Sequence, residues 1–274
     1  MAGFVQRRQI GVEYADVRVT ISDEAYLADV VAVVLLGQAQ HAANLITELD
    51  TVSPAFSTKE LVDSAIEKVR IASGSPDEIK ARTEHRDGLL FEILSWIGLI
   101  EANSGEFFLA RDPHLGATTQ GLDGLLLHLD PHRGSVKRTV ILEDKCSTNP
   151  RKTFKSKVIP AFKDHHAMKR SPDLVAAAAS LLRELPDASQ AVAQSAAVLD
   201  LKSRGYRASL AIDSVFDTKK SRRKLFEGYE ELSGLSAADR EGDGFVVGQD
   251  LRKWFHRFAQ RVDAVLQAQR VNIV

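Results

Sequence analysis

Two short apolar runs separated by a turn-rich connector constrain the fold of this 274-residue chain more than any other feature. The runs are Leu122–Leu129 and Thr139–Leu142, and the connector that follows the first is DPHRGS. Apolar runs of this length, bounded by Pro, Gly, Asp and Ser, are typical of β-strands joined by a hairpin-like loop. The sequence therefore predicts two paired strands in this stretch.

Acidic residues and a lysine gather at one end of this predicted hairpin. Asp123 stands at the start of the first strand, and Glu143, Asp144 and Lys145 end the second. The start of one antiparallel strand lies beside the end of the next, and side chains two residues apart share a face. Glu143 and Lys145 are therefore expected on one side, with Asp123 beside them if the register allows it. Two carboxylates are suitable ligands for Mg²⁺, and a lysine can orient a water molecule or stabilise negative charge. Such groups can carry out metal-assisted hydrolysis of a phosphodiester.

These residues resemble a known signature. Asp123 followed by Glu143-Asp144-Lys145 looks like the D…(D/E)xK motif of the PD-(D/E)xK, or restriction-endonuclease-like, nucleases. The resemblance covers roughly residues 82–216 and is clearest in the hairpin. Leu122 stands where a proline often precedes the aspartate in this family.

A helix before the hairpin extends the resemblance. The segment Gly88-Leu89-Leu90-Phe91-Glu92 is similar to the first-helix pattern of several such nucleases, in which a glutamate joins the metal site. Glu92 also lies within the apolar face of its helix, where a charged group is expected to be paired or functional; the alternative is a glutamate that reaches water at the edge of that face. The resemblance implies catalytic roles for Asp123, Glu143, Lys145 and Glu92, and binding of Mg²⁺ or Mn²⁺ by Asp123, Glu143 and the backbone carbonyl of Asp144.

The flanking segments predict an α-β-β-β-α-β order. We expect a long helix over 78–103, a short strand at 107–110, the hairpin, helices over 174–182 and 189–201 and a buried strand over 207–215. This order resembles the PD-(D/E)xK core. The expected fold class is therefore α/β, with a restriction-endonuclease-like mixed sheet flanked by helices and further helical segments at both ends of the chain.

Three parts of the chain are expected. Residues 1–75 form an N-terminal accessory region, residues 76–218 the nuclease core, and residues 219–274 a C-terminal helical extension packed on the core. The extension is expected to begin with a basic run, to continue through a polar loop over 234–244, and to end in an amphipathic helix from about Gln249.

Positive charge is concentrated next to the candidate site. The formal net charge of the chain is -1, so a nucleic-acid surface must be local. Residues 145–170 contain eight basic side chains and a single acidic one, Asp164. Lysine and arginine neutralise phosphates without reading sequence, and the residues expected to bind the nucleic-acid backbone are Arg151, Lys152, Lys155 and Lys157. A second basic run over 219–224 is as consistent with a solvated face as with binding.

Other classes of protein fit less well. The lone cysteine, Cys146, excludes an internal disulfide framework and a cysteine-based zinc cluster, and fits a reducing cytosol. The apolar run Ala25–Ala39 is too short to span a bilayer, and no GxxxxGK[ST] phosphate loop is present. We expect a cytoplasmic protein with no membrane association and no ATP hydrolysis.

The expected function is metal-dependent hydrolysis of nucleic acid, DNA rather than RNA. The chain as a whole resembles nuclease subunits of bacterial anti-phage defence systems. We therefore expect it to act in a defence or DNA-processing complex, beside a helicase or sensor subunit. Two alternatives stay open. The chain could be a non-catalytic nucleic-acid-binding or scaffold protein on a nuclease-like fold, or Glu143 and Lys145 could form a surface ion pair on an unrelated α/β protein.

Overall fold

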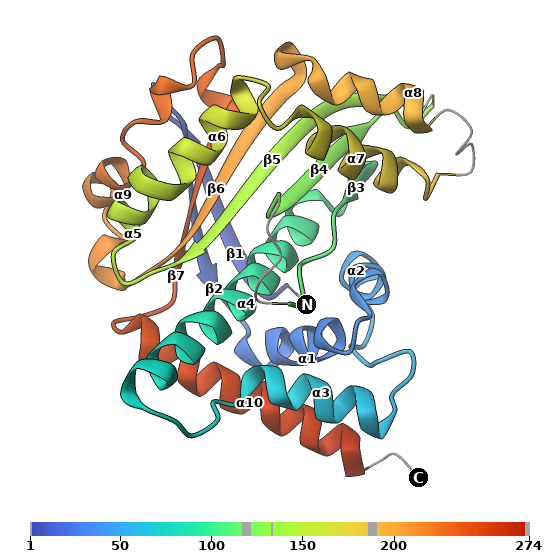
Figure 1. The fold of residues 1–274 in the computed structure, drawn as a ribbon, viewed down its shortest axis with the longest axis vertical. Coiled ribbons are helices and arrows are strands. Elements are labelled where there is room, and N and C mark those ends of the chain that lie inside the picture. The colour runs from blue at the N-terminus through green and yellow to red at the C-terminus, as the bar shows by residue number, and fades with distance from the viewer. Residues whose placement is uncertain (1, 117–121, 133, 186–190, 272–274) are drawn as a thin grey trace.

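A seven-stranded mixed sheet with helices on both faces forms the centre of the computed structural model (Figure 1), which describes residues 2–116, 122–132, 134–185 and 191–271. The strand order across the sheet is β1-β2-β7-β6-β5-β4-β3. The strands are β1 (Phe4–Ile10), β2 (Ala15–Ile21), β3 (Phe108–Ala110), β4 (Gly124–Leu129), β5 (Val136–Cys146), β6 (Arg204–Ile212) and β7 (Arg240–Val246).

Parallel pairing holds the middle of the sheet. Strands β2, β7, β6 and β5 run parallel to one another. At one edge β1 is antiparallel to β2, and towards the other edge β4 is antiparallel to both β5 and β3. The protein is therefore of mixed α/β class, and the hairpin expected at residues 122–142 is confirmed as the β4–β5 pair.

Helices cover the sheet in two layers (Figure 1). Helices α1, α2, α3, α4 and α10 lie on one side, and α5 to α8 lie on the other. The α-helices are α1 (Glu24–Leu35), α2 (Ala39–Glu48), α3 (Lys59–Val69), α4 (Pro76–Asn103), α5 (Pro150–Thr153), α6 (Ile159–His166), α7 (Ser171–Leu182), α8 (Ala191–Ser195), α9 (Lys219–Leu225) and α10 (Leu251–Val271). Short 3₁₀ turns occupy Ala196–Leu199, Leu201–Ser203, Ser214–Phe216, Tyr229–Glu231 and Ala237–Asp239.

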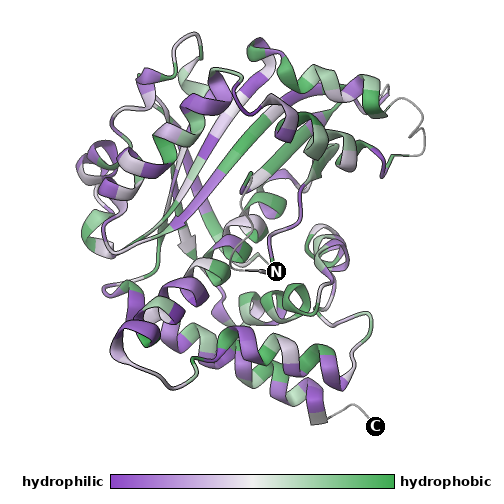
Figure 2. Cartoon of the chain, viewed as in Figure 1, coloured by the Kyte–Doolittle hydropathy of each residue, from purple (hydrophilic) through white to green (hydrophobic). Residues whose placement is uncertain are grey.

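Each face of the sheet has its own apolar core. On the α4 face, Leu126, Val140 and Leu142 pack with residues of α1, α4 and α10. On the other face, Leu125, Leu127 and Ile141 pack with Phe154, Val158 and residues of α6 to α8. Helix α1 is hydrophobic along most of its length because it lies inside the first of these cores (Figure 2). Successive side chains of β4 and β5 point to opposite faces of the sheet, so each strand contributes residues to both cores.

Helix α4 begins where the sequence provides a start signal. The Ser75 hydroxyl accepts a hydrogen bond from the backbone N–H of Glu78, the Glu78 side chain accepts one from the backbone N–H of Ser75, and Pro76 takes the first helical position. This capping box satisfies backbone donors that a helix N-terminus leaves free. The helix expected over 78–103 therefore begins two residues earlier.

The segment after β5 bends around a proline. Residues Phe154–Val158 form a π-type turn between α5 and α6, in which Ile159 N–H donates to the carbonyl of Phe154. Pro160 has no N–H, and its ring would press on the carbonyl four residues earlier in a regular helix. The wider turn gives the room that Pro160 requires.

Strands from all three expected parts of the chain pair in one sheet. Residues 1–75 contribute β1 and β2 as well as helices, and β7 lies between β2 and β6. The expectation of a polar loop over 234–244 is wrong in its second half, because β7 begins at Arg240. Its charged side chains and its glycines hid the strand in the sequence.

The expected helix over 189–201 is shorter in the structure. Its first residues lie outside the described part of the chain, which omits 186–190, and α8 is followed by a 3₁₀ turn. None of the described helices has the length and the apolar composition needed to cross a membrane.

Candidate active site

The register of the β4–β5 pair brings the first two candidate residues together. Gly124 lies opposite Leu142, so Asp123 comes beside Glu143 at the end of the pair. Gly124 suits this close pairing, because a Cβ at its position would lie 3.1 Å from the Leu142 Cβ. The sequence-based expectation that the register would join these two carboxylates is met.

Lys145 links both carboxylates. Its ammonium lies 2.9 Å from Glu143 Oε2 and donates a short hydrogen bond to Asp123 Oδ2. Glu143 and Lys145 therefore share one face of β5, as the alternation of the strand predicts. The three side chains form one charged cluster at the carboxyl end of β5, which we call the Asp-Glu-Lys cluster.

The pKa values of Glu143 and Lys145 are shifted by burial and by the charges within this cluster. The Glu143 side chain is about 4% exposed, and burial raises its pKa although Lys145 acts in the opposite direction. Burial alone would lower the pKa of Lys145, but the attraction of Glu143 and Asp123 outweighs it and raises that pKa. Burial outweighs the attraction of Lys145, so Glu143 is harder to ionise than an exposed glutamate even beside this cation.

Asp144 points to the opposite face of the sheet. Its Oδ1 accepts a hydrogen bond of 2.8 Å from the hydroxyl of Ser95 on α4. Burial raises the pKa of Asp144 to about 6, with the nearby Arg207 acting against that rise. The Asp144 side chain thus anchors the end of β5 to α4. Its backbone carbonyl, between Glu143 and Lys145, is the group expected to bind a metal.

Glu92 reaches the same region from α4. Its Oε1 accepts hydrogen bonds from the backbone N–H of His114 at 2.7 Å and from His114 Nδ1, at 2.9 Å. His114 Nε2 is buried and has no hydrogen-bond partner among the described residues. Glu92 thus fixes the loop after β3 and the orientation of its imidazole.

A pocket of about 220 Å³ joins these groups. Asp123, Asp144 and Lys145 line it from the sheet, and Glu92 lines it from α4. Further lining side chains are Glu84, His85, Leu89 and His114. Asp123, Asp144, Lys145 and Glu92 therefore line one cavity, and the buried Glu143 contacts Lys145 in its lining.

The expected phosphate-binding residues follow directly after this site. Lys152, Lys155 and Lys157 are exposed on α5 and the π-type turn. Arg151 differs, because its guanidinium is half-buried and forms an ion pair of 3.1 Å with Glu227. It also donates hydrogen bonds to the backbone carbonyls of Leu225 and Glu227. The three lysines are accessible to a ligand, whereas Arg151 is occupied within the protein.

The donors at the site suit a divalent cation in their chemistry. Asp123 and Glu143 offer hard carboxylate oxygens, and the buried Glu143 requires a neighbouring positive charge to stay ionised. No group of three or more His, Cys, Asp or Glu side chains within the described ranges is arranged to hold a metal ion. The candidate side-chain ligands are thus the two carboxylates of Asp123 and Glu143, which both contact Lys145.

No model of a known protein family matches this chain, and no curated protein is significantly similar to it.

Two neighbours of the site were not found by sequence reasoning. Ser95 lies in the apolar run of α4 and carried no signal that it would meet Asp144. His114 carries no signal in the sequence either, because it has no partner at metal-ligand spacing. Its partner, Glu92, is 22 positions away, so only the tertiary fold shows the pair.

Proposed function

We propose that this protein is a metal-dependent nuclease with a restriction-endonuclease-like core. The observation that carries the proposal is the contact of Lys145 with both Asp123 and Glu143 at the rim of a pocket. The element order supports it as well, because α4, β3, β4, β5, the helices after β5, and β6 follow one another in the expected sequence.

The residues have separate roles in this proposal. Asp123, Glu143 and the Asp144 carbonyl would hold Mg²⁺ or Mn²⁺, which when bound supplies the charge that activates water and offsets the negative phosphate. Lys145 donates a hydrogen bond to the attacking water and orients it. Glu92 positions the His114 loop at the pocket and can add a further oxygen donor.

The reaction is hydrolysis of a phosphodiester. The water oxygen forms a bond to phosphorus, and the bond from phosphorus to the leaving sugar oxygen breaks. One water proton ends on the leaving oxygen and the other on the new phosphomonoester. Because Lys145 stays protonated beside two carboxylates, it serves as a hydrogen-bond donor and a positive charge, and another group must accept the proton.

Cleavage assays test the proposal. Purified protein is incubated with plasmid, linear duplex, single-stranded DNA and RNA in the presence of Mg²⁺, Mn²⁺ or EDTA. Lys145→Ala and Asp123→Asn are expected to lower the cleavage rate by at least 100-fold, in the range found when electrostatic groups of active sites are removed. Lys137→Ala is the matched control, since Lys137 lies on the same strand and forms an exposed ion pair with Asp130.

Circular dichroism of each variant separates lost folding from lost chemistry. Asp123 precedes β4 and is partly exposed, so Asp123→Asn is expected to keep the fold even if Lys145→Ala does not. Cleavage that is equal in wild type, Lys145→Ala and Asp123→Asn would remove the assignment.

A non-catalytic nucleic-acid-binding protein is the second candidate. The observation that favours it is that Lys145 forms ion pairs with both Asp123 and Glu143. These pairs occupy the two carboxylates that a nuclease would use to bind its metal. Binding of nucleic acid with no metal-dependent cleavage on any of the four substrates would support this reading in place of the nuclease.

A further inference from the structure

Two basic runs that are far apart in the sequence meet on the surface of the fold. The first lies on α5 and the π-type turn, and the second lies on α9, which begins 69 positions after Pro150. Figure 1 shows α5 and α9 side by side at the same border of the sheet. This neighbourhood was not predicted, because the order of residues along the chain does not show that the two runs lie together in the fold.

Direct contacts fix the two helices to each other. The Arg151 guanidinium donates a hydrogen bond of 3.1 Å to the carbonyl of Leu225, the last residue of α9. Beneath the surface, the Phe154 and Phe226 rings pack edge to face with centroids 5.3 Å apart, and both are fully buried. The relative position of α5 and α9 is therefore set by a shared core and a shared hydrogen bond.

The lysines on these helices point to solvent. On α9, Lys220 and Lys224 are one helical turn apart and exposed, whereas Arg222 and Leu225 are buried. On the first run, Lys152 and Lys155 flank the buried Phe154 in the chain and are exposed. We call these four lysines the α5–α9 basic surface.

Nearby acidic groups are used elsewhere. Glu227 pairs with Arg151, and Asp217 pairs with Arg18 and Arg222. None of the four lysines of the α5–α9 basic surface forms an ion pair within the described part of the chain. In a protein of net charge -1, these cations make a local field that attracts polyanions.

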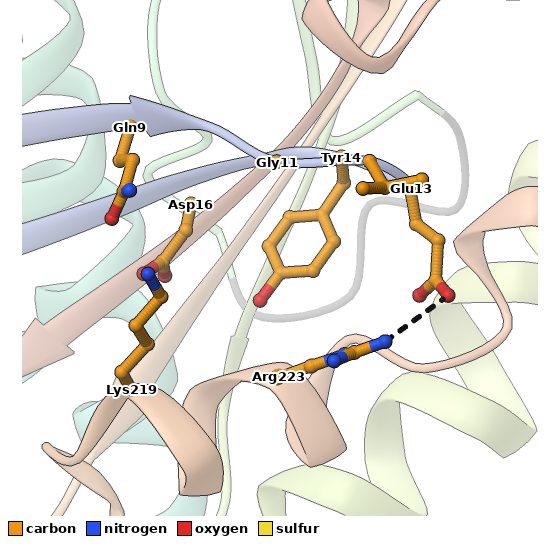
Figure 3. A pocket seen from close by; sticks show the side chains of 8 residues that line it. Gln9, Gly11, Glu13, Tyr14, Asp16, Lys219 and Arg223 are labelled. Carbon is orange, nitrogen blue, oxygen red and sulfur yellow. Dashed lines mark ion pairs between the residues drawn. The ribbon is translucent and has the colours of Figure 1, made fainter.

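The other side of α9 has a different character. Lys219 and Arg223 face a pocket beside the β1–β2 turn, together with Tyr14 and Asp16 (Figure 3). Glu13 lies 3.8 Å from Arg223 there. Because Arg223 pairs with Glu13 and Lys219 lines this separate pocket, both are left out of the α5–α9 basic surface.

Aromatic groups near the surface are turned inwards. Phe154, Phe226 and Tyr229 are fully buried and pack on one another. Proteins that bind single strands commonly stack bases on accessible aromatic rings, and this surface offers lysines without such a platform. Its chemistry suits the phosphate backbone of a duplex, which exposed point charges bind without reading sequence.

We propose that the α5–α9 basic surface binds the backbone of double-stranded nucleic acid and carries it to the Asp-Glu-Lys cluster. The proposal rests on the proposed nuclease function and extends it by assigning α9, with Lys220 and Lys224, to substrate binding. Because α5 begins five residues after Lys145 and contacts β5, a duplex bound to this surface would lie near the site.

Salt-dependent binding of a labelled duplex tests the assignment. Fluorescence anisotropy is measured in EDTA, so that no cleavage intervenes, for wild type and for Lys220→Ala/Lys224→Ala. Each lost phosphate contact is expected to lower the slope of log K against log salt by about 0.9 on a duplex, or about 1.8 for the pair. The matched control is Arg257→Ala/Arg261→Ala, which removes the same charge from two exposed positions four apart on α10.

The outcomes separate this inference from the nuclease assignment. A lower slope in the α9 variant alone supports the surface, even if the protein never cuts. Equal slopes for wild type and the α9 variant overturn it, even if Lys145-dependent cleavage is found. Equal losses in the α9 and α10 variants, tighter binding of a single strand than of a duplex, or no binding of duplex at all also overturn it.

Discussion

The hydroxyl of Ser95 donates a hydrogen bond of 2.8 Å to Asp144 Oδ1 and so ties α4 to the end of β5. Ser95 is fully buried within an otherwise apolar stretch of α4. Asp144 separates Glu143 from Lys145, so this bond holds the backbone that carries both members of the Asp-Glu-Lys cluster.

Removal of the Ser95 hydroxyl is expected to destabilise the protein. In Ser95→Ala the Asp144 carboxylate loses its donor, and an unsatisfied buried polar group costs about 1–3 kcal/mol. Urea unfolding at neutral pH measures the change. The control is Ser104→Ala at the C-terminal end of the same helix, whose hydroxyl donates to Glu101 in an exposed setting and whose loss is expected to change little. Equal midpoints for the two variants would contradict a structural role for the Ser95 bond.

The close approach of β7 to Phe226 gives a second prediction. A Cβ at Gly242 would lie 2.8 Å from Cγ of the fully buried Phe226 ring. Gly242→Ala is therefore expected to cost about 1–3 kcal/mol through overpacking, measured by thermal or urea unfolding. Gly105→Ala serves as the control, because nothing lies within 4 Å of a Cβ there. If both variants unfold at the same midpoint as wild type, the packing of Phe226 against β7 is looser than the structure indicates.

The sequence predicted the candidate site better than the sheet around it. Asp123, Glu143 and Lys145 could be placed together because hairpin register and strand alternation are local rules. Helices α4 and α10 were also anticipated, since each carries an apolar pattern at helical spacing.

Strands β1 and β7 were missed for a physical reason. In β7, Arg240, Glu241 and Asp243 alternate with glycines, so no apolar run marks the strand. Its two acidic residues are tolerated because Arg207 on β6 pairs with both of them, and β6 lies more than 25 residues earlier in the chain. In β1, polar residues fill an edge strand whose outer side faces solvent. The formation of such strands depends on residues elsewhere in the fold, which the hydrophobic periodicity of the strand's own sequence does not show.

The buried ion pair between β6 and β7 gives a third prediction. Arg207 Nε lies 2.6 Å from Asp243 Oδ2, and the side chains are about 3% and 1% exposed. Arg207→Met leaves Asp243 buried without its cation and is expected to cost about 3–5 kcal/mol. Arg207→Met/Asp243→Leu is expected to cost less than the sum of its two single variants, because the unpaired charge is gone.

A surface pair supplies the control for this cycle. Lys59 and Asp63 on α3 form an ion pair of 2.8 Å in solvent, and Lys59→Met is expected to have a much smaller effect. Urea unfolding of the four members of the Arg207–Asp243 cycle gives the coupling free energy. Strict additivity of the two single variants would show that the contact contributes no coupling.

His165 gives the last prediction, which concerns pH. Its side chain is about 2% exposed and neither ring nitrogen has a hydrogen-bond partner within the described structure. Burial lowers the pKa of His165 to about 4, and the nearby Arg170 and Arg204 act in the same direction, while Asp173 and Asp164 oppose them. The folded protein therefore holds a neutral imidazole that the unfolded chain protonates at about pH 6.5.

The sign of the pH effect follows from this difference. Between about pH 6.5 and pH 4 the unfolded chain binds the extra proton, so the free energy of unfolding falls as the pH is lowered. Each unit of pKa difference corresponds to about 1.4 kcal/mol, which sets an upper value of roughly 3 kcal/mol for this residue. The contribution is complete above pH 6.5 and is lost as the pH falls towards 4.

Urea unfolding of wild type and His165→Leu at several pH values from 7.5 to 4.5 measures this contribution. The variant has no imidazole to protonate, so its stability is expected to fall less steeply with decreasing pH than that of wild type. His256→Gln, at an exposed position on α10, is expected to keep the wild-type profile. Parallel profiles for wild type and His165→Leu would mean that the His165 ring finds water or a partner in solution, and that its burial does not destabilise the protein in acid.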